Sequence, residues 1–457
     1  MYLQSGNVKT VFLAITLLFS ILFIGCSDEI VPEAYSPSDA HAAYKYSLEQ
    51  ANLLETALGK DWVTASQNVL LEPVEIDLPF LEAFYIDSTS AFAAAYTFDV
   101  LHGQKVDVQI EINSRKSLRL FIDLFRVTED TTNPFVHVAS ADENKNRLEF
   151  EPRRNAKYII RLQPELLRGG RCSIIIRKMA SIEFPVPDRN ESSIQSFFGD
   201  PRDGGRRAHH GVDIFAPRHT PVIAPASGYV RFVGNRGIGG NVVWLYDSKR
   251  FLHYYFAHLQ TQTVERYENV EAGDTLGTVG NTGNAKTTLP HLHFGIYIQG
   301  RGPVNPYYFI TKTDTIPDGI TANLNLIGKW VKTINSSSVL LSSNTGENEI
   351  LLNRNLVMRV MAASRGMYRV HLPTGEEGYV SARQVESTEK LQEHRVAYSN
   401  YIVKDNPFGN AQLVEEISSG DDYYVLGEFN GHWFIKNGRN KTGWVKKSEE
   451  NSLRTSF

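Results

Sequence analysis

Histidine residues are concentrated in one part of the chain. Seven of the 13 histidines lie between His209 and His293, although the chain has 457 residues. A single histidine in an apolar strand is usually a core residue, whereas a cluster can bind a metal ion or transfer protons. The chain has only two cysteines, so a metal in this region must be bound by histidines and carboxylates.

Residues 290–298 alternate between apolar and other side chains, which predicts a β-strand. His291 and His293 then lie on one face, with α-carbons about 6.6 Å apart. One histidine can bind a metal while the other faces the molecule that the metal binds. The opposite face is predicted to be core and consists of Leu292, Phe294, Ile296 and Ile298.

A second group of possible ligands is His209-His210-Gly211-Val212-Asp213. In an extended strand His209 and Asp213 would be about 13 Å apart, too far to bind one ion, so the backbone must bend. Gly211 can provide that bend. Two histidines and one carboxylate would leave a fourth zinc position open for water, as in catalytic sites, whereas four protein ligands would indicate a structural site.

The regions that surround the histidines favour β-structure. Residues 27–70 are the exception and predict a helical segment with Asp39 as a cap, because Tyr44, Leu48, Ala51 and Leu54 recur at helical spacing. Residues 71–180 contain alternating apolar runs and predict a β-sandwich. This part resembles the pre-peptidase β-sandwiches of secreted bacterial peptidases, through residues 103–106 and 158–161.

The C-terminal part contains an internal repeat. The pattern Gly366-x-Tyr368-x-Val370, with Gly378-Tyr379-Val380 after it, recurs 65 residues later as Gly431-x-Trp433-x-Ile435 and Gly443-Trp444-Val445. Repeats of this length with short strands predict two small β-barrels, over residues 322–388 and 392–450. They resemble bacterial SH3-like domains, which either bind wall peptides or pack on the neighbouring domain, and both alternatives remain open.

The N-terminus predicts export. Residues 11–24 are almost wholly apolar but too few to span about 30 Å of hydrocarbon as a helix. Residues 1–26 resemble a bacterial lipoprotein signal peptide, which implies lipidation of Cys26 and a membrane anchor in the cell envelope, on the outer membrane and facing the periplasm or the surface. The alternative is an uncleaved anchor with an incidental cysteine, and it too exports the chain.

Composition limits the remaining classes. Apolar residues make up 42% and charged residues 21%, as in folded globular proteins, and the length suggests about three domains. The 47 basic and 51 acidic residues give a net charge of -4, so the whole chain has no electrostatic attraction to nucleic acid. We therefore expect a mainly β, multidomain protein with no nucleic-acid partner.

The histidine region resembles the LytM or lysostaphin-type zinc metallopeptidases. The likeness covers residues 193–309, and the domain itself is assigned to residues 185–315. The shared motifs are His209-x-x-x-Asp213, Ala257-His258-Leu259, His291-x-His293, Phe198-Gly199, Thr220-Pro221-Val222, Asn305-Pro306 and a glycine-rich run from Gly273 to Gly283. The resemblance implies an antiparallel sheet and one zinc ion per chain, bound by His209, Asp213 and His293. It also implies that His258 and His291 are catalytic and that the substrate is the peptide cross-link of peptidoglycan.

Two residues depart from that family pattern. His219 replaces a glycine before Thr-Pro-Val, which affects a turn, and Phe256 replaces a tyrosine, which would remove a hydroxyl from the cleft. His210 and His253 are assigned no role in the site.

Three functions remain open. The first is a cell-wall endopeptidase, because all five site positions are present. The second is a weak or silent adaptor that activates another wall hydrolase. The third is an envelope interaction lipoprotein in which the peptidase fold serves as a scaffold.

Overall fold

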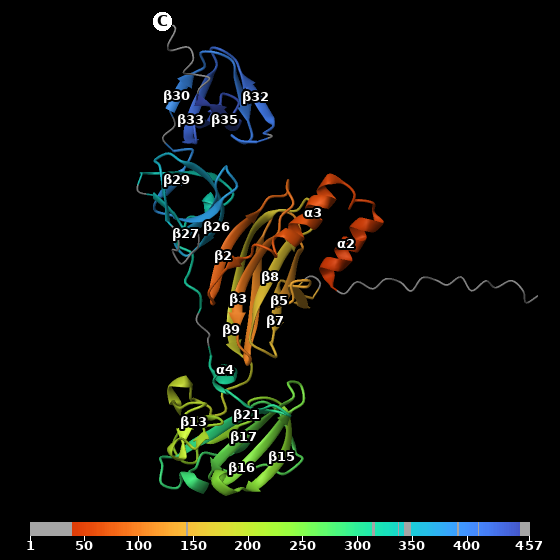
Figure 1. Cartoon of the computed structure of the whole chain (residues 1–457), viewed down its shortest axis with the longest axis vertical. Helices are drawn as coiled ribbons and strands as arrows, with labels where there is room; N and C mark the ends of the chain where they lie inside the picture. The colour runs from red at the N-terminus through yellow and green to blue at the C-terminus, as the bar shows by residue number, and fades with distance from the viewer. Residues whose placement is uncertain are drawn as a thin grey trace, which may run out of the picture.

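The computed structural model describes residues 39–142, 145–312, 316–336, 338–341, 349–390, 393–409 and 411–447. The described chain is mainly β-structure, in units that follow one another along a long axis (Figure 1). The expected mainly β, multidomain organisation is confirmed. The signal segment and Cys26 lie outside the described residues.

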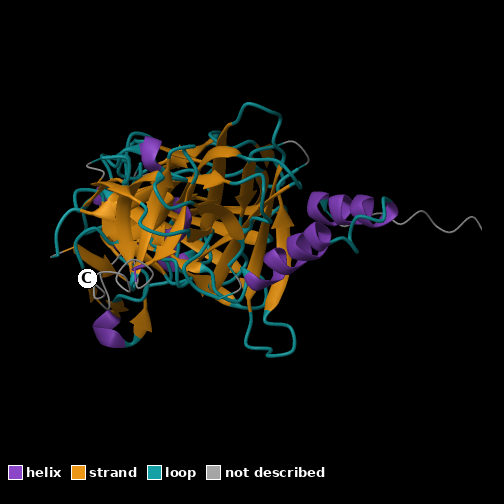
Figure 2. Ribbon diagram, turned by 90° about the horizontal axis from the view of Figure 1, so that it is seen from above, coloured by secondary structure: helices purple, strands orange, loops and turns teal. Residues whose placement is uncertain are grey.

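Two helices, α2 (Ala40–Gln50) and α3 (Ala57–Asn68), pack beside the strands (Figure 2). The predicted cap is present, because the carboxylate of Asp39 accepts a hydrogen bond of 2.7 Å from the backbone N–H of Ala42. Trp62 is fully buried and donates a 2.8 Å hydrogen bond to the carbonyl of Pro164, which holds α3 on the sheet. No helix in the described part of the chain is long and apolar enough to cross a membrane.

Residues 74–180 form two sheets that share one apolar core. This arrangement agrees with the sandwich expected from the alternating runs. The first sheet has the strand order β1 (Val74–Glu75), β3 (Ala94–Val100), β8 (Ala156–Pro164), β5 (Leu120–Val127) and β6 (Phe135–Ser140). The second contains β2 (Phe80–Ile86), β9 (Gly170–Ala180), β4 (Gln104–Asn113) and β7 (Arg147–Phe150) in that order.

The second sheet continues into the first C-terminal repeat. Strand β2 pairs with β26 (Val357–Ser364), with Ala83 opposite Ala363, and the combined sheet has 11 strands. The other strands of this repeat are β23 (Trp330–Thr333), β24 (Ser338–Leu341), β25 (Glu349–Leu352), β27 (Met367–His371), β28 (Glu377–Ser381) and β29 (Val385–Ser387). The repeat pattern does not predict this pairing, because residues 83 and 363 are far apart in sequence.

The second repeat forms a six-stranded sheet of its own. Its strands are β30 (Glu393–Val396), β31 (Tyr401–Lys404), β32 (Leu413–Ile417), β33 (Asp422–Phe429), β34 (His432–Asn437) and β35 (Thr442–Lys446). Phe434 and Trp444 also pack against Trp330 of the first repeat, with ring centroids 5.0 and 5.9 Å from it. The two repeats therefore share apolar contacts.

A buried ion pair joins the sandwich to the first repeat. The side chain of Glu82 is fully buried and lies 3.1 Å from Arg369, whose side chain is 11% exposed. Tyr96 donates a 2.5 Å hydrogen bond to the same carboxylate. Burial by itself would lower the pKa of Arg369, but the charge of Glu82 outweighs burial and keeps this pKa well above its ordinary value.

Arg369→Ala is expected to lower the free energy of unfolding by about 3 to 5 kcal/mol, because it leaves the carboxylate of Glu82 buried without its cation. Arg365→Ala is the matched control, since Arg365 forms an exposed ion pair with Asp318 and its loss should change stability by less than about 0.5 kcal/mol. Urea unfolding monitored by fluorescence measures both variants. Equal stability of the two variants would contradict a structural role for the buried pair.

The histidine region folds around an eight-stranded sheet. Its main order is β10 (Ile194–Ser196), β13 (Val212–Phe215), β21 (His291–Ile298), β17 (Leu252–Leu259), β16 (Asn241–Asp247), β15 (Gly228–Asn235) and β19 (Asn269–Val270), with β22 (Gly302–Val304) also paired to β21. A three-stranded sheet of β14 (Pro221–Ile223), β20 (Thr275–Thr278) and β18 (Thr261–Gln262) lies in the same region. The core face of β21 is fully buried at Leu292, Phe294 and Ile296, as predicted.

Arg250 connects this region to the sandwich. It forms ion pairs of 2.8 Å with Glu151 of the sandwich and 2.9 Å with Asp247 of β16. It also donates a 2.8 Å hydrogen bond to the carbonyl of Ser181. One side chain thus fixes the turn between β16 and β17 to the sandwich.

Candidate metal centre

The register of two neighbouring strands brings the candidate ligands together. Strand β13 pairs antiparallel with β21, and Asp213 lies opposite His293. Residues directly opposite in an antiparallel pair project from the same face of the sheet. The carboxylate and the imidazole are therefore adjacent although 80 residues separate them in sequence.

His209 reaches the same point because the chain bends at Gly211, just before β13. A β-carbon at Gly211 would lie 2.4 Å from the carbonyl oxygen of Phe294 and 2.8 Å from the ring of His293. The bend predicted from sequence is present. The glycine is also required for a second reason, since any side chain would displace the neighbouring strand or the His293 ring.

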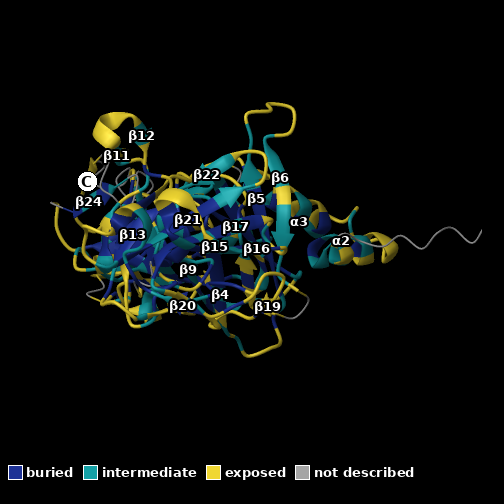
Figure 3. Cartoon of the chain, turned by 90° about the horizontal axis from the view of Figure 1, so that it is seen from below, coloured by how far each residue is buried: buried dark blue, intermediate teal, exposed yellow. Residues whose placement is uncertain are grey.

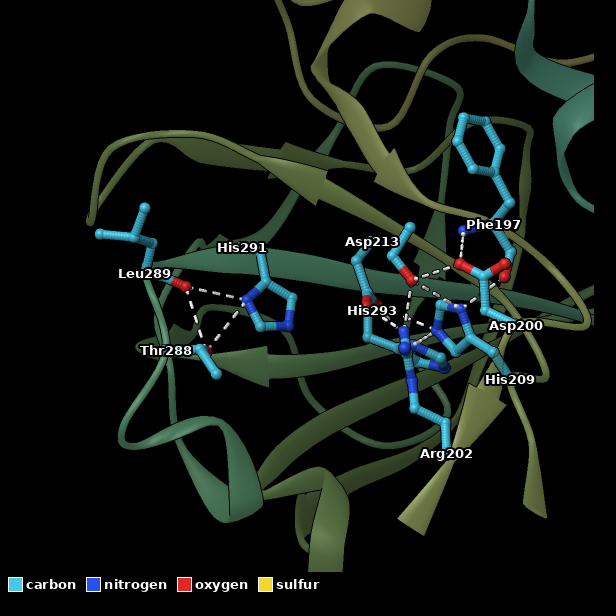
Figure 4. A network of polar contacts seen from close by, with 10 residues as sticks. Phe197, Asp200, Arg202, His209, Asp213, Thr288, Leu289, His291 and His293 are labelled. Carbon is cyan, nitrogen blue, oxygen red and sulfur yellow. Dashed lines mark hydrogen bonds and ion pairs between the residues drawn. The ribbon is translucent and has the colours of Figure 1, made fainter. Parts of the chain in front are cut away.

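Three possible ligand atoms converge in this site (Figure 4). Oδ1 of Asp213 lies 3.0 Å from Nε2 of His209 and 2.9 Å from Nδ1 of His293, and the two nitrogens are 2.9 Å apart. Within the described residues this is the only group of three such side chains that could hold a metal ion. Two imidazole nitrogens and one carboxylate oxygen are a zinc donor set with room for a further ligand, so the residues fit the ion that the sequence predicts.

Neighbouring groups orient these side chains. Nδ1 of His209 donates a 2.8 Å hydrogen bond to the carbonyl of Phe197, which leaves Nε2 as the nitrogen that faces the other ligands. Arg202 donates a 2.8 Å hydrogen bond to Oδ2 of Asp213, so Oδ1 is the oxygen that remains for a metal. Arg202 also donates to the hydroxyl of Ser196.

The electrostatics of the group favour the metal-binding protonation states. Burial would raise the pKa of Asp213, but the neighbouring His209 and His293 outweigh burial and hold this pKa far below its ordinary value. Burial lowers the pKa of His293 despite the charge of Asp213. An ionised carboxylate beside a neutral imidazole is the form that binds zinc.

His258 and His291 lie beside this group. Their ring centroids are 5.1 Å apart, and the ring of His258 is 6.0 Å from that of His293. Nδ1 of His258 donates to the carbonyl of Thr282, and Nδ1 of His291 donates to the carbonyl of Leu289, each over 2.9 Å. Each ring therefore keeps Nε2 as a possible proton acceptor.

Burial, with a smaller contribution from His291 and His293, lowers the pKa of His258 to about 4. The His258 ring is therefore neutral at neutral pH. A neutral imidazole can accept a proton or a hydrogen bond in the cleft.

A local backbone feature places His258 in the cleft. Strict alternation along β17 would put His258 on the core face with Tyr254 and Phe256, which are fully buried. His258 instead has a φ of 63°, in the left-handed region, and its side chain turns toward the other histidines. Strand parity alone does not reveal this position.

The prediction that Phe256, in place of a tyrosine, removes a hydroxyl from the cleft is wrong. Phe256 packs in the core against Phe294, so a tyrosine here would not present its hydroxyl to the cleft. The hydroxyl-bearing residue that sequence reasoning missed is Tyr255, which lines the cleft with its ring 5.8 Å from that of His293. Side-chain alternation along the strand could have identified Tyr255, because Tyr255 and Ala257 both project from the open face of the sheet.

The remaining histidines lie away from the metal group. His253 contacts Tyr246 and Trp244 on the open face of the sheet, and His210 is exposed. His219 has a φ of 70°, a conformation that favours glycine, which agrees with the expected effect on a turn. None of these three lines the cleft.

The five candidate site residues line one cleft of about 400 Å³. This volume is within the range of small-molecule and peptide sites. The other cleft residues come from the hairpin of β11 (Pro201–Arg202) and β12 (Arg207–Ala208), from the sheet and from two loops. They are Ser196, Arg202, Asp203, Arg207, Phe215, Ile238, Gly239, Tyr255, Ala257, Asn284, Ala285 and Thr288.

The site and fold define a class of protein. Residues 207–306 match the family described as Peptidase family M23. The chain therefore contains a peptidase domain of the M23 type, which includes the LytM and lysostaphin enzymes. The match is limited to this part of the chain.

Several curated proteins are similar over the same region. The L-Ala--D-Glu endopeptidase of Bacillus subtilis is 38% identical over 122 residues, which are 25% of this chain and 37% of that protein. The peptidoglycan DD-endopeptidase ShyC of Vibrio cholerae is 37% identical over 100 residues, 22% of each chain. The murein hydrolase activator NlpD of Escherichia coli is 32% identical over 121 residues, 26% of this chain and 30% of that one. The chain thus spans between 22% and 37% of the length of these relatives.

Among solved structures, the catalytic domain of lysostaphin from Staphylococcus simulans is 31% identical to this chain. The alignment covers 25% of this chain and 87% of that domain, with a TM-score of 0.23.

Proposed function

We propose that this protein is a zinc-dependent endopeptidase that hydrolyses peptide cross-links of bacterial peptidoglycan. The observation that carries the proposal is the convergence of one carboxylate and two imidazoles, with two further histidines beside them in one cleft. The M23 family match and the endopeptidases among the relatives support it.

His209, Asp213 and His293 would hold the zinc ion. When bound, zinc would polarise the scissile carbonyl and lower the pKa of water, which supplies a nucleophile at neutral pH. Arg202 and the carbonyl of Phe197 keep two of the ligands in the orientation that binding requires.

His258 and His291 would move protons and bind the substrate. Their Nδ1 atoms are occupied by backbone carbonyls, so each ring works through Nε2. A neutral His258 can orient or deprotonate the attacking water, and either ring, once protonated, can donate to the developing oxyanion.

The direct test uses the zinc-loaded full-length protein and purified cross-linked muropeptides. The proposal expects the cross-linked species to disappear and products of one hydrolysed peptide bond to appear by mass spectrometry. A chelator should stop the reaction and added zinc should restore it. Unchanged muropeptides with a zinc-loaded protein would contradict the proposal.

An adaptor function is the second candidate, and the likeness to a murein hydrolase activator favours it. The complete group of His209, Asp213 and His293 counts against it, because an adaptor does not need a metal site. If the zinc-loaded chain cuts no muropeptide but accelerates a separate wall hydrolase, the adaptor function replaces the enzyme.

We also propose that the protein is a lipid-anchored envelope protein, supported by the signal-like residues 1–26. One relative, an Escherichia coli protein described as an uncharacterized lipoprotein, is 39% identical over 95 residues.

Cys26→Ser is expected to move the protein from the membrane fraction to the soluble fraction after signal removal, because a short apolar segment without acyl chains anchors poorly. The measurement is fractionation followed by immunoblotting, with Cys172→Ser as control, since Cys172 is buried in the sandwich. Retention of the processed Cys26 variant in the membrane would contradict lipidation.

The C-terminal repeats are proposed to be SH3-like modules that stabilise the protein by packing. Tyr368, Tyr379 and Trp444 of the repeated pattern are buried. Trp433 is partly exposed, and Arg395 covers its ring at 4.2 Å. Three of the four aromatic residues thus support packing over wall binding.

A further inference from the structure

The two sides of the cleft differ in charge. One side is the hairpin of β11 (Pro201–Arg202) and β12 (Arg207–Ala208), which contributes Arg202, Asp203 and Arg207 to the cleft. This hairpin projects at the edge of the molecule, and its turn is exposed (Figure 3). The opposite side consists of two loops whose cleft residues are uncharged: Ile238, Gly239, Asn284, Ala285 and Thr288.

The two arginines of the hairpin have different partners. Arg202 is bound to Oδ2 of Asp213, so its charge is used to orient a ligand. Among the described residues Arg207 has one ion pair, from Nε to Asp203 over 2.9 Å, and the two side chains are 36% and 51% exposed. A guanidinium has five N–H donors in a fixed fork, so a single contact through Nε leaves donors that can bind a carboxylate.

Arg207 also acts on the sheet that forms the floor of the cleft. Burial raises the pKa of Tyr297 on β21, and the positive charge of Arg207 opposes this rise. Tyr297 is four residues beyond His293 on the same strand and the same face. The guanidinium of Arg207 therefore lies close enough to the open face of β21 for its charge to act on Tyr297.

We propose that Arg207 is a specificity residue that binds a free carboxylate of the substrate, next to the scissile bond. This inference rests on the proposed endopeptidase function. The contact with Arg207 would favour cross-linked peptides that carry a side-chain carboxylate or an α-carboxylate near the cut bond. Uncharged bridges such as oligoglycine would be disfavoured.

The alternative is that Arg207 only stabilises the hairpin. Its partner Asp203 is four residues earlier, and an exposed pair of this kind contributes little to stability. The two functions differ in one measurable respect. A structural role would affect every substrate equally, whereas a carboxylate contact would affect only substrates that carry the charge.

The test compares two synthetic cross-linked muropeptides that are identical except for a free carboxylate or a primary amide beside the scissile bond. The zinc-loaded full-length protein is expected to prefer the carboxylate form by about tenfold in kcat/KM, since hydrogen bonds to charged groups contribute about that factor. Arg207→Gln should remove the preference by raising KM for the carboxylate peptide, with kcat unchanged, and should leave the amide peptide unaffected. Arg207→Lys should recover part of the preference.

Arg206→Gln is the matched control. Arg206 belongs to the same hairpin, is exposed and does not line the cleft, so its variant should behave as the wild type. Equal losses on both peptides in Arg207→Gln would overturn the inference in favour of a structural role. An equal loss of preference in Arg206→Gln would overturn it in favour of a diffuse charge effect.

A binding measurement separates this inference from the proposed function. If the wild type cuts neither peptide, the endopeptidase proposal fails, and the Kd values of the same two peptides then test Arg207. A tighter Kd for the carboxylate peptide that is lost in Arg207→Gln supports the recognition role. Equal Kd values for the two peptides in the wild type overturn it.

Discussion

His209→Ala and Asp213→Ala are each expected to abolish zinc binding and to reduce hydrolysis by more than about 10⁴-fold, since polarisation of the carbonyl and activation of water are both lost with the metal. The reason is geometric. Oδ1 of Asp213 lies within 3.0 Å of both histidine nitrogens, so either change leaves only two ligand atoms at the site. Elemental analysis of the purified variants, together with muropeptide hydrolysis, measures both effects.

His210→Ala is the matched control for His209→Ala. His210 is adjacent in sequence but exposed, and it is not part of the group of ligand atoms. We expect one zinc per chain and full turnover in this variant. Full zinc content in both His209→Ala and Asp213→Ala would show that the ion binds elsewhere.

His258→Ala and His291→Ala are expected to keep zinc and to lower kcat by about 10² to 10⁴-fold, the usual contribution of general acid-base catalysis. Both rings lie beside the metal group, and their Nδ1 atoms are held by backbone carbonyls. These variants therefore separate proton transfer from metal binding. Zinc content and single-turnover kinetics of the metal-loaded variants are the measurements.

His253→Ala provides the control on the same strand as His258. It lies on the open face against Tyr246, outside the cleft, so its loss should leave turnover unchanged. Wild-type turnover in the zinc-loaded His258 variant would remove His258 from the mechanism. Loss of zinc in that variant would make His258 a ligand.

The structure also limits how the C-terminal repeats can be tested. Deletion of residues 328–457 would remove β26 from the edge of β2 and Arg369 from the buried carboxylate of Glu82. A loss of activity in that truncated chain would report on the stability of the sandwich. Variants of Trp433 disturb neither this strand pairing nor the buried pair, because its partly exposed ring packs within the second repeat.

Local sequence patterns were sufficient wherever one strand, turn or cap decides the outcome. Alternation along residues 290–298 places His291 and His293 opposite the buried Leu292 and Phe294, because the side-chain period of a strand is two. The cap at Asp39 and the bend at Gly211 follow from local chemistry in the same way. These features depend on neighbours within a few residues.

Features that depend on strand pairing required the tertiary structure. The register of β13 on β21 brings Asp213 to His293, and the pairing of β2 with β26 joins the sandwich to the first repeat. A left-handed backbone at His258 reverses the face that alternation assigns to it. Arg207 reaches the cleft only because its hairpin folds beside the metal group. Long-range packing determines which side chains share one cavity, and a local sequence pattern does not.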